Sequence, residues 1–286
     1  MVRLHKYSGA GNDFVVLDGR SEDVSAFRTP ERIAALCDRK TGFSPSFAGL
    51  TGESRRGADG LMILTDDPAY DFRMEFFNPD GSGGMMCGNG GRCITAFADE
   101  LGIRPRDGRV YHFVAGDGPH TAEILRCAQD DKEQGARKTV RLRMIDVHTF
   151  HPALDGWFVD TGTRHFVRFV PDADAVDVET EGRQVRWDPV FAPIGANANF
   201  VSVDPDGTLR VRTFEKGVEG ETLACGTGIT AAAIAAYLND RHSPTRSANL
   251  HYNIQARIAR LSVEFVPGDG CFTDVYLTGP AEEILP

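Results

Sequence analysis

The sequence lacks any long apolar run: no stretch approaches the roughly 18 apolar residues that a membrane-spanning helix needs. The longest candidate, 229–238, is too short and is interrupted by Thr230. The first six residues contain no apolar h-region, so we expect no secretory signal. Basic residues are outnumbered, with 31 Lys and Arg against 41 Asp and Glu, which gives a net charge of −10. This balance disfavours general binding of nucleic acid or anionic membranes but does not exclude a small anionic substrate.

The six cysteines include no CxxC pair, and their spacing fits neither a zinc site nor a disulfide framework. Reduced thiols in a cytoplasmic protein are the simplest interpretation. A thiol redox or metal-binding protein that uses Cys87 and Cys93 is one alternative. Five residues separate these two cysteines, which on a helix places the thiols on different faces and disfavours that alternative.

A four-residue pattern occurs twice, as Cys-Gly-Asn-Gly at 87–90 and as Cys-Gly-Thr-Gly at 225–228. A strand-like segment precedes each copy, and a stretch that contains Ile, Thr and Ala follows each copy. The 286 residues suit one large domain or two of about 140 residues each, and a repeat separated by 138 positions favours two. Composition, with 41% hydrophobic and 25% charged residues, is that of an ordinary globular protein.

Each copy of the pattern predicts a cysteine at the N-terminus of a helix. The first backbone N–H groups of a helix have no partner inside it, and the helix dipole is positive at that end, so a thiolate is stabilised there. The same N–H groups suit a carboxylate or another anion. We therefore expect Cys87 and Cys225 to be reactive thiols, each beside an anion-binding turn formed by Gly88 and Asn89 or by Gly226 and Thr227.

A structural interpretation competes with this one. A single buried cysteine is usually a small core residue, and a single Gly-rich turn is usually only a turn. Two copies in matched context favour a functional interpretation, because an inert core cysteine needs neither a following glycine nor a repeat.

Runs of apolar, β-branched and aromatic residues bounded by turn residues indicate strands. We expect helices after Thr29, which precedes Pro30, and from about 91 to 101 and 226 to 238. Segment 129–138 is interpreted as an exposed turn or interdomain segment, and 172–180 as a solvated helix or loop. Many strands and few helices predict an α+β protein with a mainly antiparallel sheet. The expected strands are 2–7, 14–18, 61–64, 72–77, 110–115, 121–126, 139–144, 156–161, 165–170, 200–203, 208–214, 254–265 (one or two strands) and 271–278.

Six short motifs are spread along the chain between residues 9 and 228. They are Gly-Ala-Gly-Asn-Asp-Phe at 9–14, Gly-Ala-Asp-Gly-Leu at 57–61, Asn-Pro-Asp-Gly-Ser at 78–82, Met-Cys-Gly-Asn-Gly-Gly-Arg-Cys at 86–93, Gly-Ala-Asn-Ala-Asn-Phe at 195–200 and Glu-Thr-Leu-Ala-Cys-Gly-Thr-Gly at 221–228. With these motifs in this order, the chain resembles the diaminopimelate epimerases, a family of cofactor-independent amino-acid racemases.

The resemblance implies two pseudo-symmetric domains, each a curled sheet around a central helix, with the site in the cleft between them. We expect the N-terminal domain to comprise 1–130 plus 272–286 and to carry Cys87. The C-terminal domain would comprise 131–271 and carry Cys225. The last strand, near 275–278, would return to the first domain.

The resemblance also implies a mechanism, in which a thiolate removes a proton from one face of the α-carbon and a thiol returns one to the other face. Cys87 and Cys225 would be this base and acid pair, with His165 and Glu215 beside them. The residues implied to bind substrate are Asn12, Asn78, Gly88, Asn89, Thr163, Asn197, Glu215, Lys216, Gly226 and Thr227.

The sequence departs from the family pattern at several positions. Lys216 stands where Arg is usual, and Lys cannot offer a carboxylate a bidentate fork. Thr163-Arg164-His165 replaces Asn-Pro-His, and Arg164 is a candidate for the missing guanidinium. Residues 43–56 look like an insertion, and 218–221 has one residue more than the shortest family version.

We expect the chain to epimerise LL-2,6-diaminopimelate to the meso form in lysine and peptidoglycan-precursor synthesis. An alternative is another racemase of the same fold, acting on proline or hydroxyproline. We expect a cytoplasmic homodimer with a small amino-acid substrate, no nucleic-acid or membrane partner, no pyridoxal phosphate and no metal.

Overall fold

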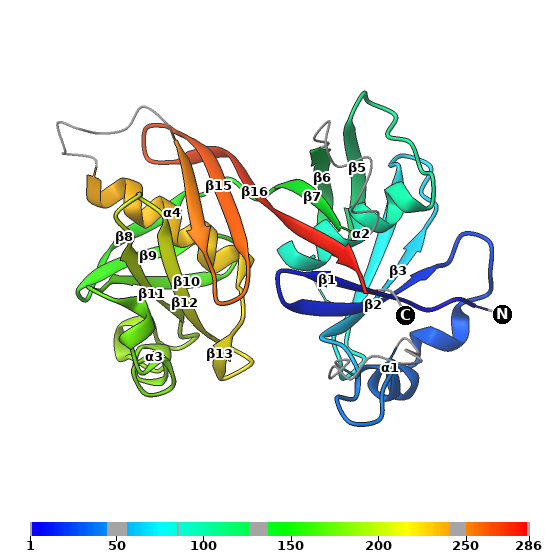
Figure 1. Ribbon diagram of the computed structural model, residues 1–286, viewed down its shortest axis with the longest axis horizontal. Helices are drawn as coiled ribbons and strands as arrows, with labels where there is room; N and C mark the ends of the chain where they lie inside the picture. Colours follow the sequence, from blue (N-terminus) through cyan, green and yellow to red (C-terminus); the bar gives the residue numbers. More distant parts are fainter. Residues whose placement is uncertain (1, 45–55, 85, 126–136, 241–249, 285–286) are drawn as a thin grey trace. The chain divides into compact units, whose positions relative to one another are not determined.

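The computed structural model describes residues 2–44, 56–84, 86–125, 137–240 and 250–284, and the chain forms two compact units (Figure 1). Unit 1 comprises Met1–Leu142 and Gly279–Pro286, and unit 2 comprises Arg143–Thr278. These divisions fall later than the sequence-based ones at 130 and 271. The strand that follows residue 130 pairs with another strand of unit 1, so this unit extends beyond the predicted boundary. The last strand of the chain pairs within unit 2 as far as Thr278, so unit 2 extends beyond residue 271.

Unit 1 is a sheet that closes around one helix. Its strands pair in chain order from β1 to β7, and the end of β16 pairs with both β7 and β1. The sheet therefore has no free edge at this point. The strands are β1 (His5–Gly9), β2 (Asn12–Asp18), β3 (Gly60–Thr65), β4 (Phe72–Phe77), β5 (Val110–Ala115), β6 (Gly118–Leu125), β7 (Arg137–Arg143) and β16 (Phe272–Glu283).

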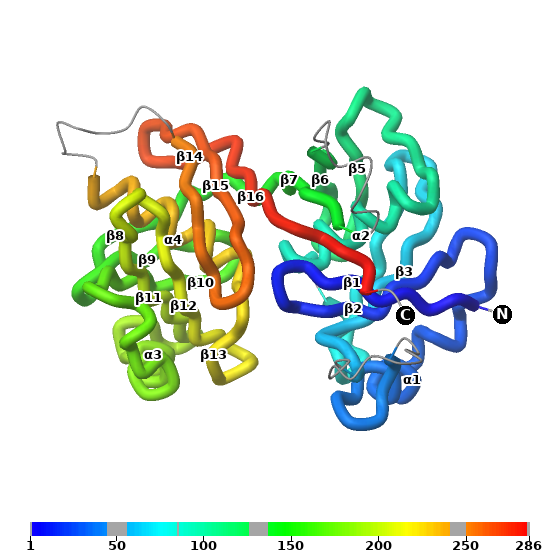
Figure 2. The backbone as a smooth tube through the Cα atoms, viewed as in Figure 1, coloured from blue at the N-terminus to red at the C-terminus, as the bar shows by residue number. Residues whose placement is uncertain are grey.

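In unit 2 the same sheet continues from β16 around a second helix. From β16 the strand order is β15, β14, β12, β11, β10, β9 and β8. The short strand β13 lies off this path and pairs with the end of β12, at Thr213–Glu215. Figure 2 traces this order across the unit. The strands are β8 (Thr149–Ala153), β9 (Gly156–Asp160), β10 (Arg164–Phe169), β11 (Asn197–Val203), β12 (Leu209–Glu215), β13 (Gly220–Thr222), β14 (His251–Gln255) and β15 (Arg260–Pro267).

The central helices are α2 (Gly88–Glu100) in unit 1 and α4 (Gly226–Asp240) in unit 2. Helix α2 packs on β1, β2, β3 and β6, and α4 packs on β9, β10, β11, β12 and β15. Most residues of α4 are buried, and its run of alanines lets strands approach it closely. Each unit thus has a core formed by its own strands and one enclosed helix, as the α+β interpretation with mainly antiparallel pairing requires.

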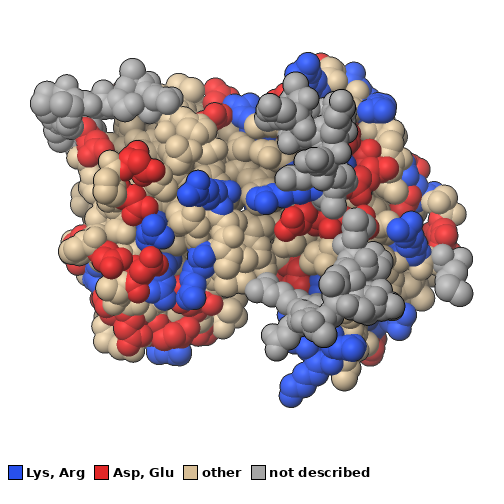
Figure 3. Space-filling model, viewed as in Figure 1, with Lys and Arg blue, Asp and Glu red and all other residues tan. Residues whose placement is uncertain are grey.

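The remaining helices lie outside the sheets. Helix α1 (Pro30–Cys37) begins as expected, with the Thr29 hydroxyl accepting a bond from the Arg32 N–H at 3.3 Å. Helix α3 (Val178–Arg186) covers β11, β12 and β13, and its first turn carries the acidic residues Glu179 and Glu181. Acidic side chains gather at the lower left of Figure 3, where Figure 1 places α3. The short 3-10 helices are η1 (Ser25–Arg28), η2 (Ala173–Ala175) and η3 (Pro189–Phe191).

Three features differ from the sequence-based expectation. Helix α2 starts at Gly88 rather than near 91, so its glycines are helical. Strands β8 and β13 were not among the expected strands. Strand β8 is an edge strand that contains Pro152, and β13 has only three residues, so neither shows the residue pattern typical of a strand. Most of the expected turn at 129–138 lies outside the described residues. No described helix combines the length and apolarity needed to cross a bilayer.

Candidate active site

Cys87 lies at the N-cap of α2, as its sequence pattern predicts. Its backbone is extended (φ −98°, ψ 137°), and its carbonyl accepts the first helical bond from the Gly91 N–H at 2.7 Å. The side chain is half-buried and makes no capping bond to the helix. The N–H groups of Gly88 and Asn89 belong to the first turn, where the helix itself supplies no acceptor.

Asn12 and Asn89 lie beside this turn and share a directed chain of hydrogen bonds. Asn89 donates through its amide nitrogen to Oδ1 of Asn12, and Nδ2 of Asn12 donates to Oδ2 of Asp59 at 3.0 Å. A carboxylate can only accept, so Asp59 fixes which end of the Asn12 amide faces it. Arg39 in turn donates to Asp59. Asp59 belongs to the motif at 57–61, but its role was not predicted from the sequence.

Asn78 is placed differently from the other expected binding residues of unit 1. It opens the turn after β4, where its Nδ2 donates to the Ser82 hydroxyl at 3.0 Å and its backbone N–H donates to the Ser82 carbonyl. These bonds account for the Asn-Pro-Asp-Gly-Ser motif as a turn. This bonding within the turn sets Asn78 apart from Asn12 and Asn89, whose amides bond to each other.

The second cysteine of the motif, Cys93, is a core residue. It is fully buried on α2, and a Cβ on Gly9 of β1 would lie 2.9 Å from its sulfur. Burial raises the pKa of the Cys93 thiol well above its usual range. Cys93 is therefore a neutral thiol, in contrast to the half-buried Cys87 at the helix end.

Cys225 occupies the equivalent position in unit 2. Its carbonyl accepts the Ile229 N–H at 2.8 Å, the counterpart of the bond at Cys87, and α4 begins at the next residue. The side chain is largely buried, and its sulfur lies 3.4 Å from the hydroxyl oxygen of Thr227. Thr227 thus contributes a side chain as well as the expected backbone N–H.

His165 is connected to this hydroxyl. Its Nε2 lies 2.9 Å from the hydroxyl oxygens of both Thr163 and Thr227, and its Nδ1 lies 3.1 Å from Nδ2 of Asn199. His165 is fully buried, and burial lowers its pKa to about 3, so the ring is neutral at physiological pH.

Asn199 decides which ring nitrogen carries the proton. Its Nδ2 donates to the Phe166 carbonyl at 2.9 Å, and its Oδ1 accepts from the Thr213 hydroxyl at 2.9 Å. The second Nδ2 hydrogen therefore faces Nδ1 of His165, which must accept, and the proton of the neutral ring is on Nε2. Asn199 and Asn197 alternate along β11 with one residue between them, so the motif at 195–200 could have indicated that both face inward.

Gly228 makes room for this arrangement. A Cβ at this position would lie 2.4 Å from Oδ1 of Asn199 and 3.2 Å from Cε1 of His165. Only glycine lets the side chains of Asn199 and His165 pack against the first turn of α4. The second glycine of the repeated pattern thus has a packing role next to the thiol.

Asn197 joins two strand ends near the site. Its Nδ2 donates to the Arg164 carbonyl at 3.0 Å, and its Oδ1 accepts from the Lys216 backbone N–H at 2.7 Å. This amide places Lys216 at the end of β12. The Lys216 side chain is half-exposed and forms no ion pair with the described residues.

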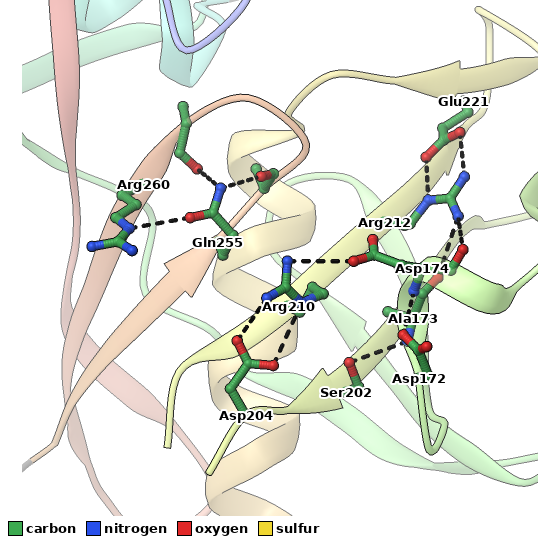
Figure 4. Close-up of polar contacts among 12 residues, drawn as sticks. Asp172, Ala173, Asp174, Ser202, Asp204, Arg210, Arg212, Glu221, Gln255 and Arg260 are labelled. Atoms are coloured by element: carbon green, nitrogen blue, oxygen red, sulfur yellow. Dashed lines mark hydrogen bonds and ion pairs between the residues drawn. The ribbon is translucent and has the colours of Figure 1, made fainter. Parts of the chain in front are cut away.

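Glu215 is oriented by a neighbouring strand. The Thr222 hydroxyl of β13 donates to Oε1 of Glu215. Strand β13 is held in turn by Arg212, whose guanidinium pairs with both oxygens of Glu221 at 2.7 Å and donates to the Ala173 carbonyl (Figure 4). The extra residue at 218–221 belongs to the turn before β13, in which Glu219 adopts a positive φ of 57°.

Arg164 points away from the His165 group. Neighbouring residues on a strand face opposite sides, and the Arg164 guanidinium lies 5.2 Å from the Phe158 ring centroid and donates to the Phe191 carbonyl at 3.1 Å. Within unit 2 this side chain is therefore used in packing, and it does not replace a guanidinium at position 216. Most of the apparent insertion at 43–56 lies outside the described residues.

The structure groups the expected residues into two sets, one in each unit. The set in unit 1 consists of Cys87, Gly88, Asn89 and Asn12. The set in unit 2 consists of Cys225, Gly226, Thr227, Thr163, His165 and Asn197. At the adjacent end of β12 lie Glu215 and Lys216. Among the described residues, no three His, Cys, Asp or Glu side chains are grouped closely enough to bind a metal ion.

Comparison with known proteins gives consistent matches over the whole chain. A sequence profile for the diaminopimelate epimerase family matches residues 4–123 and 157–261. A diaminopimelate epimerase from Flavobacterium psychrophilum is 36% identical, with 99% of this chain and 98% of the relative covered. A diaminopimelate epimerase from Chlorobaculum tepidum is 38% identical, with 97% of each chain covered.

Solved structures share the fold at lower identity. A phenazine biosynthesis protein from Bacillus anthracis matches with a TM-score of 0.65 at 14% identity, covering 99% of this chain and 98% of that chain. A probable proline racemase from Agrobacterium radiobacter matches with a TM-score of 0.60 at 18% identity, covering 100% and 91%. At these identities the likeness concerns the fold alone.

Proposed function

This chain belongs to the diaminopimelate epimerase family, and on that basis we propose that it interconverts LL-2,6-diaminopimelate and the meso isomer by proton transfer between two cysteines. The observation that carries the proposal is the repeated placement of one thiol at the first turn of an enclosed helix in each unit. It is an isomerase of lysine and peptidoglycan-precursor synthesis in this proposal.

Inversion requires that a proton leave one face of the α-carbon and that another arrive on the opposite face. One thiolate takes the α-proton and becomes a thiol, and the other thiol gives its proton and becomes a thiolate. Cys87 and Cys225 exchange these roles when the reaction runs in reverse. Atoms and charge balance without an oxidant, a metal or a carbonyl cofactor.

Negative charge moves towards the α-carboxylate as the α-proton leaves. Backbone N–H groups of Gly88, Asn89, Gly226 and Thr227, at two helix N-termini, are suited to stabilise it. Their geometry is fixed by the folded helices, so no reorganisation is needed when charge develops.

Polar side chains around the thiols are assigned two tasks. His165 and Glu215 tune the proton-transfer pair. Asn12, Asn78, Thr163, Asn197, Glu215 and Lys216 bind the substrate, with Glu215 and Lys216 towards its distal amino-acid group. The half-exposed Lys216 ammonium supports this assignment, because it could pair with the distal carboxylate as a point charge.

The thiol chemistry also bears on where the protein acts. Proton transfer by thiols requires that both stay reduced, which a cytoplasmic location provides. We also propose that the protein is a homodimer. Size-exclusion chromatography with light scattering tests this last point directly, since a monomer would elute at the 31.2 kDa of a single chain.

A direct assay tests the activity. Purified protein should convert LL-diaminopimelate to the meso isomer, and should leave proline and hydroxyproline unchanged, when each is followed by chiral chromatography. Activity should persist after treatment with a chelator, and the protein should show no visible absorbance from pyridoxal phosphate. Turnover of proline in place of diaminopimelate would instead support the alternative racemase.

A further inference from the structure

Arg92 carries a positive charge in the interior of unit 1. It is the fifth residue of α2, and its side chain is 0% exposed. An arginine side chain stays protonated in proteins, so the folded unit contains a buried charge. Such a charge is costly unless an anion or a full set of hydrogen bonds compensates it.

The hydrogen bonds of Arg92 are all made to neutral groups. Nη1 donates to the Gly88 carbonyl at 3.2 Å, Nη2 donates to Oδ1 of Asn89 at 2.8 Å, and Nε donates to the Pro280 carbonyl at 3.4 Å. No carboxylate among the described residues pairs with the guanidinium, in contrast to the buried Arg186 of unit 2, whose Nε lies 3.0 Å from Glu219. The charge of Arg92 therefore has no fixed acidic partner in the part of the chain that the structure describes.

Among the described residues, the acidic groups that act on the Arg92 charge are the thiols of Cys93 and Cys87. Burial lowers the pKa of the Arg92 guanidinium, and the thiols of Cys93 and Cys87 act in the opposite direction. Cys93 is fully buried and its own pKa is raised, so it does not become the anion. Cys87 is half-buried, at the end of the same helix, and immediately precedes the Gly88 carbonyl that Arg92 binds.

We propose that Arg92 is a positioning residue for Cys87: its buried positive charge stabilises the Cys87 thiolate, and its two terminal nitrogens fix the first turn of α2. Because Nη2 occupies Oδ1 of Asn89, the amide nitrogen of Asn89 must face Oδ1 of Asn12. Arg92 and Asp59 thus lie at the two ends of a hydrogen-bonded chain that runs through Asn89 and Asn12. Arg92 can only donate and Asp59 can only accept, so together they fix the orientation of both side-chain amides.

This inference deepens the proposed function by naming the source of charge stabilisation for one thiol, and it can be tested without substrate. The pH dependence of alkylation at Cys87 by iodoacetamide, followed by peptide mass spectrometry, gives the thiol pKa. In the unsubstituted protein we expect a midpoint below the ordinary thiol value of about 8.5. A midpoint at or above that value would overturn the proposal whatever the variants do.

Two substitutions separate charge from hydrogen bonding. Arg92→Gln removes the charge and should raise the Cys87 midpoint by about one pH unit or more, whereas Arg92→Lys should keep most of the depression. Arg186→Gln, which neutralises a buried arginine of unit 2, should leave the Cys87 midpoint unchanged. The Cys225 midpoint in the same samples should not move in either Arg92 variant.

An unchanged Cys87 midpoint in Arg92→Gln would contradict the proposal. So would an equal rise in Arg92→Gln and Arg186→Gln, because that would indicate general loss of stability. Epimerase activity is not used in this experiment. A protein that fails to turn over diaminopimelate could therefore still confirm the role of Arg92, and an active epimerase could still show no effect of Arg92 on Cys87.

Discussion

Nε2 of His165 lies 2.9 Å from the hydroxyl oxygen of Thr227, which itself lies 3.4 Å from the sulfur of Cys225. The proton of the neutral ring is on Nε2, because Asn199 donates to Nδ1. The Thr163 hydroxyl also donates to Thr227, at 3.1 Å. The lone pairs of the Thr227 hydroxyl oxygen thus accept from His165 and Thr163. The hydroxyl hydrogen is therefore oriented to be donated to the sulfur of Cys225.

Removing this donor should make Cys225 a weaker acid. Thr227→Val keeps the shape of the side chain but leaves the Cys225 thiolate without the hydroxyl. A hydrogen bond to a charged group contributes roughly 1.5–3 kcal/mol, so we expect kcat/KM to fall by about 10- to 100-fold and the alkylation midpoint of Cys225 to rise. Thr227→Ser restores the hydroxyl and should restore both. Equal behaviour of the Val and Ser variants would show that the hydroxyl does not act on the thiol.

Neutral His165 should make the stability of unit 2 depend on pH. In the unfolded chain this histidine binds a proton near pH 6.5, whereas in the folded chain it does so only near pH 3. Between these values the unfolded state binds the extra proton, so the free energy of unfolding falls as pH falls, by at most about 1.4 kcal/mol per pH unit. Above pH 6.5 the contribution is absent.

Urea unfolding at pH 7, 6 and 5 measures this effect. Both tryptophans, Trp157 and Trp187, belong to unit 2, so their fluorescence follows the relevant unit. In His165→Gln the free energy of unfolding should fall less steeply with decreasing pH than in the unsubstituted protein. Parallel curves for the two proteins would mean that His165 is not held neutral by the fold.

The repeat of Cys-Gly-x-Gly was sufficient to predict two helix N-termini, because the pattern specifies local backbone geometry. The partners of these thiols could not be predicted in the same way. Asn199, Thr222 and Asp59 act through side chains that are far apart in the sequence and meet only when strands pair. Helix α3 was not predicted as a helix over its full length because only Val178 and Val185 supply its apolar face.

Position 216 should govern binding of the distal carboxylate. Lys216→Met should raise the KM for diaminopimelate about tenfold or more with a smaller change in kcat, because it removes a charge assigned to substrate and leaves the thiols intact. Lys216→Arg should keep or lower the KM, since it supplies a bidentate fork. Lys40→Met, on an exposed residue of unit 1, is the matched control. An unchanged KM in Lys216→Met would remove the case for this residue at the distal group.

Oxidation should inactivate the enzyme reversibly. If Cys87 and Cys225 act on one carbon, mild oxidation should join them in a disulfide, and a reductant should restore activity. Peptide mapping of the oxidised protein should find the Cys87–Cys225 cross-link. Cys271→Ser, which removes another half-buried thiol, should be inactivated to the same extent. Inactive oxidised protein without that cross-link would argue against a shared substrate carbon.

Proton transfer in D₂O tests the two-cysteine mechanism most directly. With LL-diaminopimelate, the unsubstituted protein should form the meso isomer with deuterium at the inverted α-carbon, as NMR can follow. Cys87→Ser and Cys225→Ser should each lose interconversion by about 10²- to 10⁴-fold, because serine is too weak an acid to replace either partner. Both variants should still bind substrate through the unchanged N–H groups of the two helix ends. Near-normal formation of the deuterated meso isomer by either variant would contradict the mechanism.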